Sequence, residues 1–205
     1  MCKDDFFAKW SSLHGNTQIS GVVRGWLGIS YQCARFLTFL RVTPNLLTFL
    51  GVLFASLMLL KPFSLFAIAL LMLSLLADGV DGSVAILQRR ESNWGATIDS
   101  VADRASEALW LLVVYQIGVP AWLALSLWIC AATQEYARAR AASLGHFVID
   151  VVTPTERPVR ASVIFIILVG AQLNISGITS AAFILLAAQL VSLLLVMQNA
   201  YKKLK

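Results

Sequence analysis

Residues 63–103 read FSLFAIALLMLSLLADGVDGSVAILQRRESNWGATIDSVAD, and this stretch places acidic residues directly after an apolar helix. The apolar run of residues 63–77 has 15 residues, which cover only about 23 Å when they are helical. The hydrocarbon core of a bilayer is about 30 Å thick, so a helix that spans it must continue beyond this run. The sequence therefore predicts that Asp78 and Asp81 lie in or near a membrane.

The composition of the whole chain is that of a membrane protein. Apolar residues make up 59% of the 205 residues and charged residues only 13%, about half the charged share of an ordinary soluble domain. The net charge is +5, but no basic and aromatic surface pattern accompanies it, so we expect no nucleic-acid partner. We therefore expect one membrane domain over residues 1–205, surrounded by membrane lipids.

Apolar segments of helical length predict an all-α integral membrane protein with six transmembrane helices. The predicted spans are residues 44–60, a second from about residue 63 to beyond Asp78, then 94–117, 120–141, 161–173 with a start near 158, and 178–200. Residues 44–200 thus form a six-helix core. Ahead of it, residues 19–40 alternate apolar side chains with polar ones such as Arg24 and Arg35, which predicts an N-terminal interfacial amphipathic helix.

The positions of the basic residues predict how the chain crosses the membrane. With six spans, fifteen of the 16 Lys and Arg residues fall on the side of the two termini, and only Lys61 falls on the other side. Basic residues concentrate on the cytoplasmic side of membrane proteins. We therefore expect a multi-pass protein of the plasma membrane with both termini in the cytoplasm.

Four aspartates are predicted to meet near the cytoplasmic edge of the membrane. Asp78 and Asp81 are three residues apart, Asp99 and Asp103 are four apart, and each pair shares one helical face. The short link at residues 87–94 makes the two helices antiparallel neighbours. So many carboxylates cannot all stay ionised in a partly dry site without a counter-charge.

Two kinds of cation could supply that counter-charge, a nearby arginine or a divalent metal ion. Arg104 follows Asp103 in the chain but is expected to point about 100° away from it around the helix. We therefore favour Mg²⁺ or Mn²⁺, which bind oxygen ligands. The alternative is that the acids cap helix ends or form salt bridges there. Glu107, one turn further along, is expected to pair with Arg104.

Small residues lie among these acids, including Gly82, Ala85 and Gly95. In membrane helices such residues allow close packing of neighbouring helices. Glycine can also leave room for a flat ligand against the backbone. Both interpretations stay open for these positions.

The spacing of these residues resembles the signature of the CDP-alcohol phosphotransferase family, D-x-x-D-G-x-x-A-R followed by G-x-x-x-D-x-x-x-D. Residues 78–86 read DGVDGSVAI and residues 95–103 read GATIDSVAD, so all four acids, both glycines and the alanine match. Residues 44–48, PNLLT, resemble the family's lead-in to its first span. Ile86 departs from the signature, because the family has an arginine there that is expected to help hold the nucleotide.

This resemblance implies transfer of a phosphatidyl group from a CDP-linked lipid, such as CDP-diacylglycerol, to an alcohol, with release of CMP. A divalent metal held by Asp78, Asp81 and Asp99 would neutralise the pyrophosphate and the leaving CMP. Asp103 would be the general base, and it is also placed among the metal ligands. The implied nucleotide pocket consists of Gly82, Ala85, Gly95, Asn45 and Thr48. Family members are usually homodimers, so a homodimer is expected.

Four arginines resemble the acceptor-binding regions of bacterial family members, namely Arg138, Arg140, Arg157 and Arg160. The resemblance implies an acceptor that carries a phosphate, such as inositol phosphate or glycerol phosphate. Arginine suits this role because its guanidinium group binds phosphate with two parallel hydrogen bonds. The alternative is that these arginines are ordinary basic residues of the cytoplasmic face in contact with lipid head groups.

Two other functions remain open. An ion or proton transporter would also place acids inside the membrane, although it would predict them deep in several helices, whereas here they cluster on the cytoplasmic side. A catalytically impaired family member with a role in assembly is the other alternative, and Ile86 is the residue that suggests it. Release of CMP from a CDP-linked lipid would separate the enzyme from both.

Overall fold

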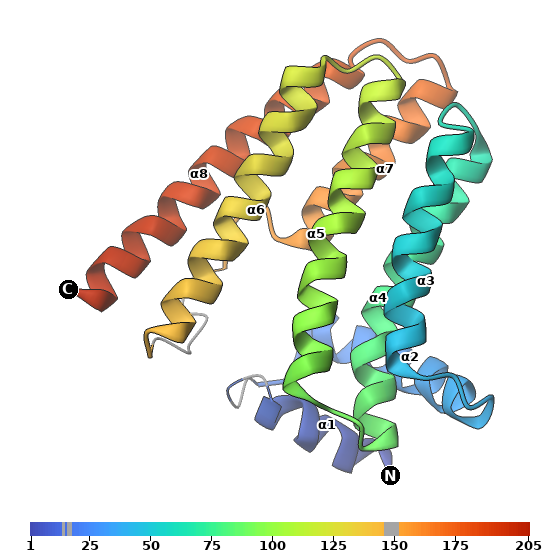
Figure 1. Ribbon diagram of the computed structural model, residues 1–205, viewed down its shortest axis with the longest axis vertical. Coiled ribbons are helices and arrows are strands. Elements are labelled where there is room, and N and C mark those ends of the chain that lie inside the picture. Colours follow the sequence, from blue (N-terminus) through green and yellow to red (C-terminus); the bar gives the residue numbers. More distant parts are fainter. Residues whose placement is uncertain (14, 16–17, 146–151) are drawn as a thin grey trace. The chain divides into compact units, whose positions relative to one another are not determined.

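The computed structural model describes residues 1–13, 15, 18–145 and 152–205, and every regular element within these ranges is a helix (Figure 1). In chain order the elements are α1 (Lys3–Leu13), α2 (Gly21–Phe39), α3 (Pro44–Leu57), a short 3₁₀ helix η1 (Met58–Leu60), α4 (Leu65–Gln88), α5 (Asn93–Gln116), α6 (Ala121–Ser143), α7 (Arg157–Gln172) and α8 (Ile178–Leu204). The all-α prediction is confirmed, and each predicted span contains one of these helices. The predicted amphipathic segment coincides with α2, whereas the patterns in the sequence did not predict α1.

The chain divides into two compact units, and the first consists of Met1–Ala55 and Met72–Ser106. Two hydrophobic clusters hold this unit together. One joins α1, α2 and α4 through Phe6, Leu27, Tyr31 and Ile86. The other joins α2, α3 and α4 through Ala34, Leu47, Val80 and Val84. The N-terminal helices therefore pack directly against the part of α4 that carries the first two aspartates.

Small residues allow α4 to approach its neighbours closely within the first unit. A Cβ atom added at Gly79 would lie 2.7 Å from Cζ2 of Trp26, so a side chain at this position would collide with the indole ring. The hydroxyls of Ser30 and Ser83 are 2.6 Å apart. Polar contacts of this kind join membrane helices where apolar packing alone gives little preference. They fix the rotation of α4 and hence the direction in which its aspartates point.

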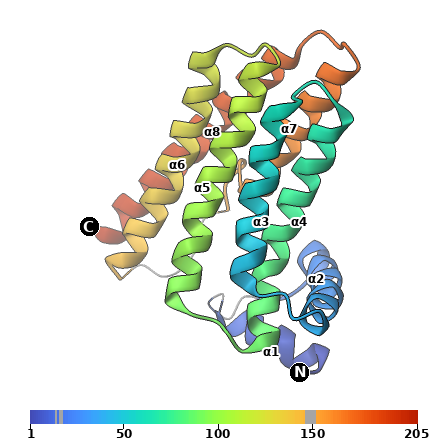
Figure 2. The same ribbon diagram turned by 45° about the vertical axis from the view of Figure 1, so that its right-hand side comes forward.

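The second unit consists of Ser56–Leu71 and Glu107–Lys205, and its largest helix contact is between α6 and α8. Both views show these two helices side by side (Figures 1 and 2). The first turn of α7 contains Pro158, a position where the missing backbone N–H costs nothing. Gly177 precedes α8 with φ of 112°, a backbone conformation that favours glycine.

Within the described residues, two helices, α4 and α8, are long and apolar enough to cross a membrane by themselves. The segments Val23–Phe39 and Pro44–Leu60 pass the same test only together, as a pair bent by 108°. Helix α5 carries too many charged side chains to pass this test of length and composition, and α7, with 16 residues, is too short to pass it. Much of the α8 surface is apolar and exposed, including Phe183, Ile184, Leu190, Val191 and Leu194. The protein therefore has several apolar helices suited to a lipid environment.

Candidate functional site

A tight turn between α4 and α5 brings the aspartates together. Arg89 ends α4 with φ of 53°, and the backbone N–H of Arg90 donates to the carbonyl of Ala85 over 2.9 Å. Such a left-handed residue is a common way to terminate a helix. Ser92 then caps α5, because its hydroxyl accepts a 3.0 Å hydrogen bond from the backbone N–H of Gly95. Only four residues separate the two helices, as the sequence predicts.

Three of the four predicted aspartates form a compact group. One carboxylate oxygen from each of Asp78 on α4 and Asp99 and Asp103 on α5 lies within 4.8 Å of the others, and all three residues are half-buried. Carboxylate oxygens are the ligands that Mg²⁺ and Mn²⁺ prefer, and half-burial leaves room for a substrate beside the ion. The residues therefore fit a divalent metal ion of the predicted kind.

Asp81 lies outside that group among the described residues. The hydroxyl of Thr48 donates to its Oδ2 over 2.5 Å, and both residues are buried. The negative charges of Asp99 and Asp78 nevertheless act on the Asp81 carboxylate, so it belongs to the same electrostatic environment. Its role as a metal ligand stays a prediction, and so does the placing of Thr48 at the nucleotide.

The expected direction of Arg104 is wrong. Nη2 of Arg104 lies 3.8 Å from Oδ2 of Asp103, so the guanidinium group reaches the carboxylate beside it. The backbone bonds of consecutive helical residues do diverge by about 100°, but the long arginine side chain is flexible enough to turn back. An arginine therefore does supply part of the counter-charge to the aspartates.

The predicted nucleotide-binding positions lie around the same helix ends. A Cβ atom added at Gly82 would meet nothing within 4 Å, so the surface there is open. At Gly95 an added Cβ would lie 3.1 Å from Oγ of Ser92 and 4.0 Å from Oδ1 of Asn45. Ala85 is half-buried on α4. These positions are compatible with a ligand in the first unit, and their contact with a nucleotide stays a prediction.

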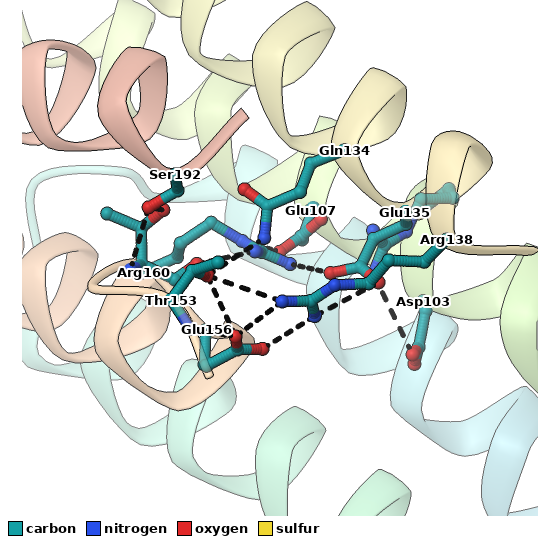
Figure 3. A network of polar contacts seen from close by, with 11 residues as sticks. Asp103, Glu107, Gln134, Glu135, Arg138, Thr153, Glu156, Arg160 and Ser192 are labelled. Carbon is teal, nitrogen blue, oxygen red and sulfur yellow. Dashed lines mark hydrogen bonds and ion pairs between the residues drawn. The ribbon is translucent and has the colours of Figure 1, made fainter. Parts of the chain in front are cut away.

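In the second unit, Arg138 of α6 forms a two-point ion pair with Glu156, the residue before α7 (Figure 3). Nη1 and Nη2 of the guanidinium donate to Oε2 and Oε1 over 2.8 and 2.6 Å. Burial alone would raise the pKa of Glu156, but hydrogen bonds from Arg138 and Thr153 outweigh it and lower the pKa to about 2. Glu156 is therefore ionised at neutral pH.

Arg160 of α7 is buried in a second ion-pair network, with only 2% of its side chain exposed. Its Nε donates to Oε1 of Glu107 over 2.7 Å, its Nη1 donates to the carbonyl of Thr155 over 2.7 Å, and its Nη2 donates to Glu135 over 3.3 Å. Glu107, for which the sequence favours Arg104 as partner, thus forms its buried ion pair with Arg160. The contact of Arg160 with an acceptor stays a prediction.

The other two predicted acceptor residues have different surroundings. Arg140 is exposed, and its Nη1 donates to the hydroxyl of Ser143 over 3.3 Å. The guanidinium carbon of Arg157 lies 5.5 Å from the centre of the Trp110 ring, within the range of a cation–π contact. Arg138 and Arg160, in contrast, both form short ion pairs with carboxylates.

The profile of the CDP-alcohol phosphatidyltransferase family matches residues 36–198, which is most of the chain. The chain belongs to this family. The matched range begins within α2 and ends within α8, so it includes the three grouped aspartates and the four arginines. The family resemblance of residues 78–103 is therefore confirmed.

Two known proteins illustrate the likeness, one of them in two crystal structures. The archaetidylinositol phosphate synthase of Aeropyrum pernix is 37% identical over 79 residues, a match that spans 38% of this chain and 41% of that protein. A crystal structure of the Mycobacterium tuberculosis phosphatidylinositol phosphate synthase with CDP-DAG bound has a TM-score of 0.69 at 20% identity, covering 84% of this chain and 94% of that one. The same enzyme in complex with manganese and citrate has a TM-score of 0.68 at 19% identity, covering 84% and 88%.

The one departure from the phosphatidyltransferase signature has a structural explanation. Ile86 is 3% exposed and packs in the hydrophobic cluster with Phe6, Leu27 and Tyr31. An arginine at this position would place a charge among apolar side chains of α1 and α2, at a large cost in desolvation. Isoleucine therefore serves to anchor the N-terminal helices on α4.

The carboxylate partners of the arginines are the residues that sequence analysis missed. Glu135 lies on α6, three residues before Arg138, whereas Glu156 and its neighbour Thr153 lie in the segment before α7, 18 and 15 positions from Arg138. A general signal was available nonetheless, because an arginine in an apolar helix requires a counter-charge. That signal predicts that partners exist but does not identify them.

Proposed function

We propose that this chain transfers a phosphatidyl group from a CDP-linked lipid, such as CDP-diacylglycerol, to an alcohol and releases CMP. The observation that carries this proposal is the group formed by Asp78, Asp99 and Asp103 at the positions of the family signature. A relative with the same fold has been solved with CDP-DAG bound, and the same enzyme has been solved with manganese.

The grouped aspartates can divide the chemistry between them. A divalent metal, Mg²⁺ or Mn²⁺, would supply positive charge against the pyrophosphate and the leaving CMP when bound by Asp78 and Asp99, with Asp81 as a further ligand. The acceptor oxygen attacks the phosphorus on the lipid side, and the phosphorus–oxygen bond to CMP breaks. Asp103 takes the hydroxyl proton as general base and contributes to holding the ion.

The nucleotide would bind against the open side of the α4–α5 turn. Gly82 leaves space there, and Gly95 and Ala85 flank it with side chains no larger than a methyl group. Asn45 has its amide oxygen near Gly95. Thr48, whose hydroxyl donates to Asp81, would be a further polar group of the nucleotide pocket.

For the acceptor we favour a phosphorylated polyol such as inositol phosphate or glycerol phosphate. The named relatives are an archaetidylinositol phosphate synthase and a phosphatidylinositol phosphate synthase. The arginines that would contact the phosphate are Arg138, Arg140, Arg157 and Arg160. Contact of these arginines with lipid head groups is the alternative.

Matched acceptors test this choice. Purified protein with CDP-diacylglycerol and Mn²⁺ should release CMP with inositol phosphate or glycerol phosphate, and much less with inositol or glycerol. Equal rates with the unphosphorylated alcohols would mean that the arginines contact lipid head groups and not an acceptor phosphate.

For the membrane arrangement we propose six spans with both termini cytoplasmic in the plasma membrane, and for the assembly we propose a homodimer. The amphipathic helix α2 would lie in the interface. Its Leu27 and Tyr31 are buried in the first unit, while Ile29 and Phe36 are exposed large apolar residues on other faces. An apolar surface left exposed on an amphipathic helix suits the head-group boundary of a bilayer.

Asp99→Asn should weaken metal binding, because Asp99 is proposed as a metal ligand. An asparagine keeps the shape of the side chain but loses the charge, so the affinity for Mn²⁺ should fall by at least about 10–100-fold, the cost of losing even an outer partner of a metal ligand. Electron paramagnetic resonance of free Mn²⁺ during a titration measures this. Turnover should recover in part at high Mn²⁺.

Ser100→Ala is the matched control for this experiment, because Ser100 is exposed and its hydroxyl donates to the carbonyl of Ala96 within its own helix. An unchanged Mn²⁺ affinity in Asp99→Asn would show that Asp99 is not a metal ligand.

A further inference from the structure

The carboxylate of Glu156 is held by donors of the kind that bind phosphate. Besides the two guanidinium nitrogens of Arg138, the backbone N–H of Thr153 donates to Oε1 over 2.7 Å and the hydroxyl of Thr153 donates to the same oxygen over 2.8 Å. Guanidinium, backbone N–H and hydroxyl groups together are a common phosphate-binding set. The four donors thus form an anion site, and a carboxylate of the chain itself fills it (Figure 3).

A buried amide orients the Thr153 hydroxyl for this task. Nε2 of Gln134, a fully buried residue of α6, donates to Oγ1 of Thr153 over 3.2 Å. Because Oγ1 accepts this bond, its own proton is available to donate to Glu156. The anion site is therefore built from residues well inside the second unit as well as from the loop before α7.

Exposure distinguishes this ion pair from its neighbour. The side chains of Arg138 and Glu156 are 21% and 29% exposed, whereas those of Arg160 and Glu107 are 2% and 3% exposed. A ligand from the aqueous phase can therefore reach Arg138 directly, whereas contact with Arg160 would require its buried ion pair with Glu107 to rearrange. The second carboxylate near Arg138, Oε2 of Glu135, lies 3.9 Å from Nη1 and leaves the close position to Glu156.

We propose that Glu156 occupies the site for the acceptor phosphate on Arg138, as an internal anion that an incoming phosphate must displace. This inference rests on the phosphorylated acceptor of the proposed function. A phosphate with about two negative charges near neutral pH can replace one carboxylate, whereas a neutral hydroxyl cannot. Glu156 thereby sets the class of acceptor, because it blocks Arg138 against ligands that lack a strong anion.

Glu156→Gln tests the displacement directly. The amide keeps the shape and can still accept hydrogen bonds, but it no longer competes as an anion. The dissociation constant for inorganic phosphate, measured by calorimetry in a nonionic detergent, should fall about tenfold, equivalent to ~1.4 kcal/mol. The KM for the phosphorylated acceptor should fall in parallel, while the KM for CDP-diacylglycerol should stay unchanged.

Two further variants serve as controls for this test. Glu91→Gln removes one negative charge from an exposed residue that pairs with Lys9 over 3.5 Å, and it should leave phosphate affinity unchanged. Glu156→Asp keeps the charge but shortens the side chain, so phosphate should bind it more tightly than the wild type but less tightly than Glu156→Gln. If the glutamine variant does not fold, the phosphate affinity of Glu156→Asp is the test.

Phosphate affinity that is unchanged or weaker in both Glu156 variants would overturn the inference and make Glu156 a structural partner of Arg138. Absence of CMP release from wild-type protein with every acceptor would be a failure of the proposed function instead. The phosphate titration does not depend on turnover, so the two failures are distinguishable.

Discussion

Asp103→Asn is expected to lower the turnover of CMP release by about 10²–10⁴-fold, the usual contribution of a general base. Asparagine has nearly the same size as aspartate, so the substitution leaves no cavity, but it cannot accept the proton of the acceptor hydroxyl. The measurement is the initial rate of CMP release from CDP-diacylglycerol at saturating acceptor. Binding of the CDP-linked lipid should survive.

The metal dependence of the two α5 variants separates their roles. Asp99 and Asp103 lie one helical turn apart in the same group of carboxylates. Excess Mn²⁺ should restore part of the activity of Asp99→Asn but should not restore Asp103→Asn. If Asp103→Asn keeps near-normal turnover at saturating Mn²⁺, Asp103 is not the base and the proton must pass to another group.

Arg160→Met is expected to lower the free energy of unfolding by about 3–5 kcal/mol, the cost of removing one partner from a buried ion pair. Methionine fills much of the space, but Glu107 is then left charged with 3% of its side chain exposed. The carbonyl of Thr155 also loses its partner. Denaturant unfolding followed by circular dichroism in detergent measures the change.

Comparison variants make the origin of this loss clear. Arg140→Met removes an exposed arginine and should change the unfolding free energy by less than about 1 kcal/mol, as for other surface charges. The double variant Arg160→Met with Glu107→Gln should recover part of the stability because it leaves no unpaired buried charge. A loss in Arg160→Met no larger than in Arg140→Met would contradict the buried network.

Local spacing was sufficient to predict the metal group. Asp78 on one helix and Asp99 and Asp103 on the next are linked by a short turn, and helical periodicity then determines which side chains face each other. The same spacing placed Asp81 with them, but the structure gives Asp81 a hydrogen bond from Thr48 on α3. Helical periodicity within α4 and α5 contains no information about a third helix.

Contacts between distant segments explain the rest of what sequence analysis missed. The pairing of Arg138 with Glu156 crosses 18 positions of the chain, and that of Arg160 with Glu107 crosses 53. Ile86 looks like a defect in a signature when it is considered alone. Its burial against α1 becomes visible only in the folded chain, and no apolar periodicity had marked α1 as a helix.

Release of CMP from CDP-diacylglycerol by the purified protein is the most direct test of the proposed function. With Mn²⁺ and inositol phosphate or glycerol phosphate present, CMP and a new phospholipid should form in equal amounts. Removal of the metal with a chelator should stop the reaction, and re-addition should restore it. No release of CMP under any of these conditions, or release that is unaffected by the chelator, would contradict the assignment of Asp78, Asp99 and Asp103 to a metal-dependent phosphatidyl transfer.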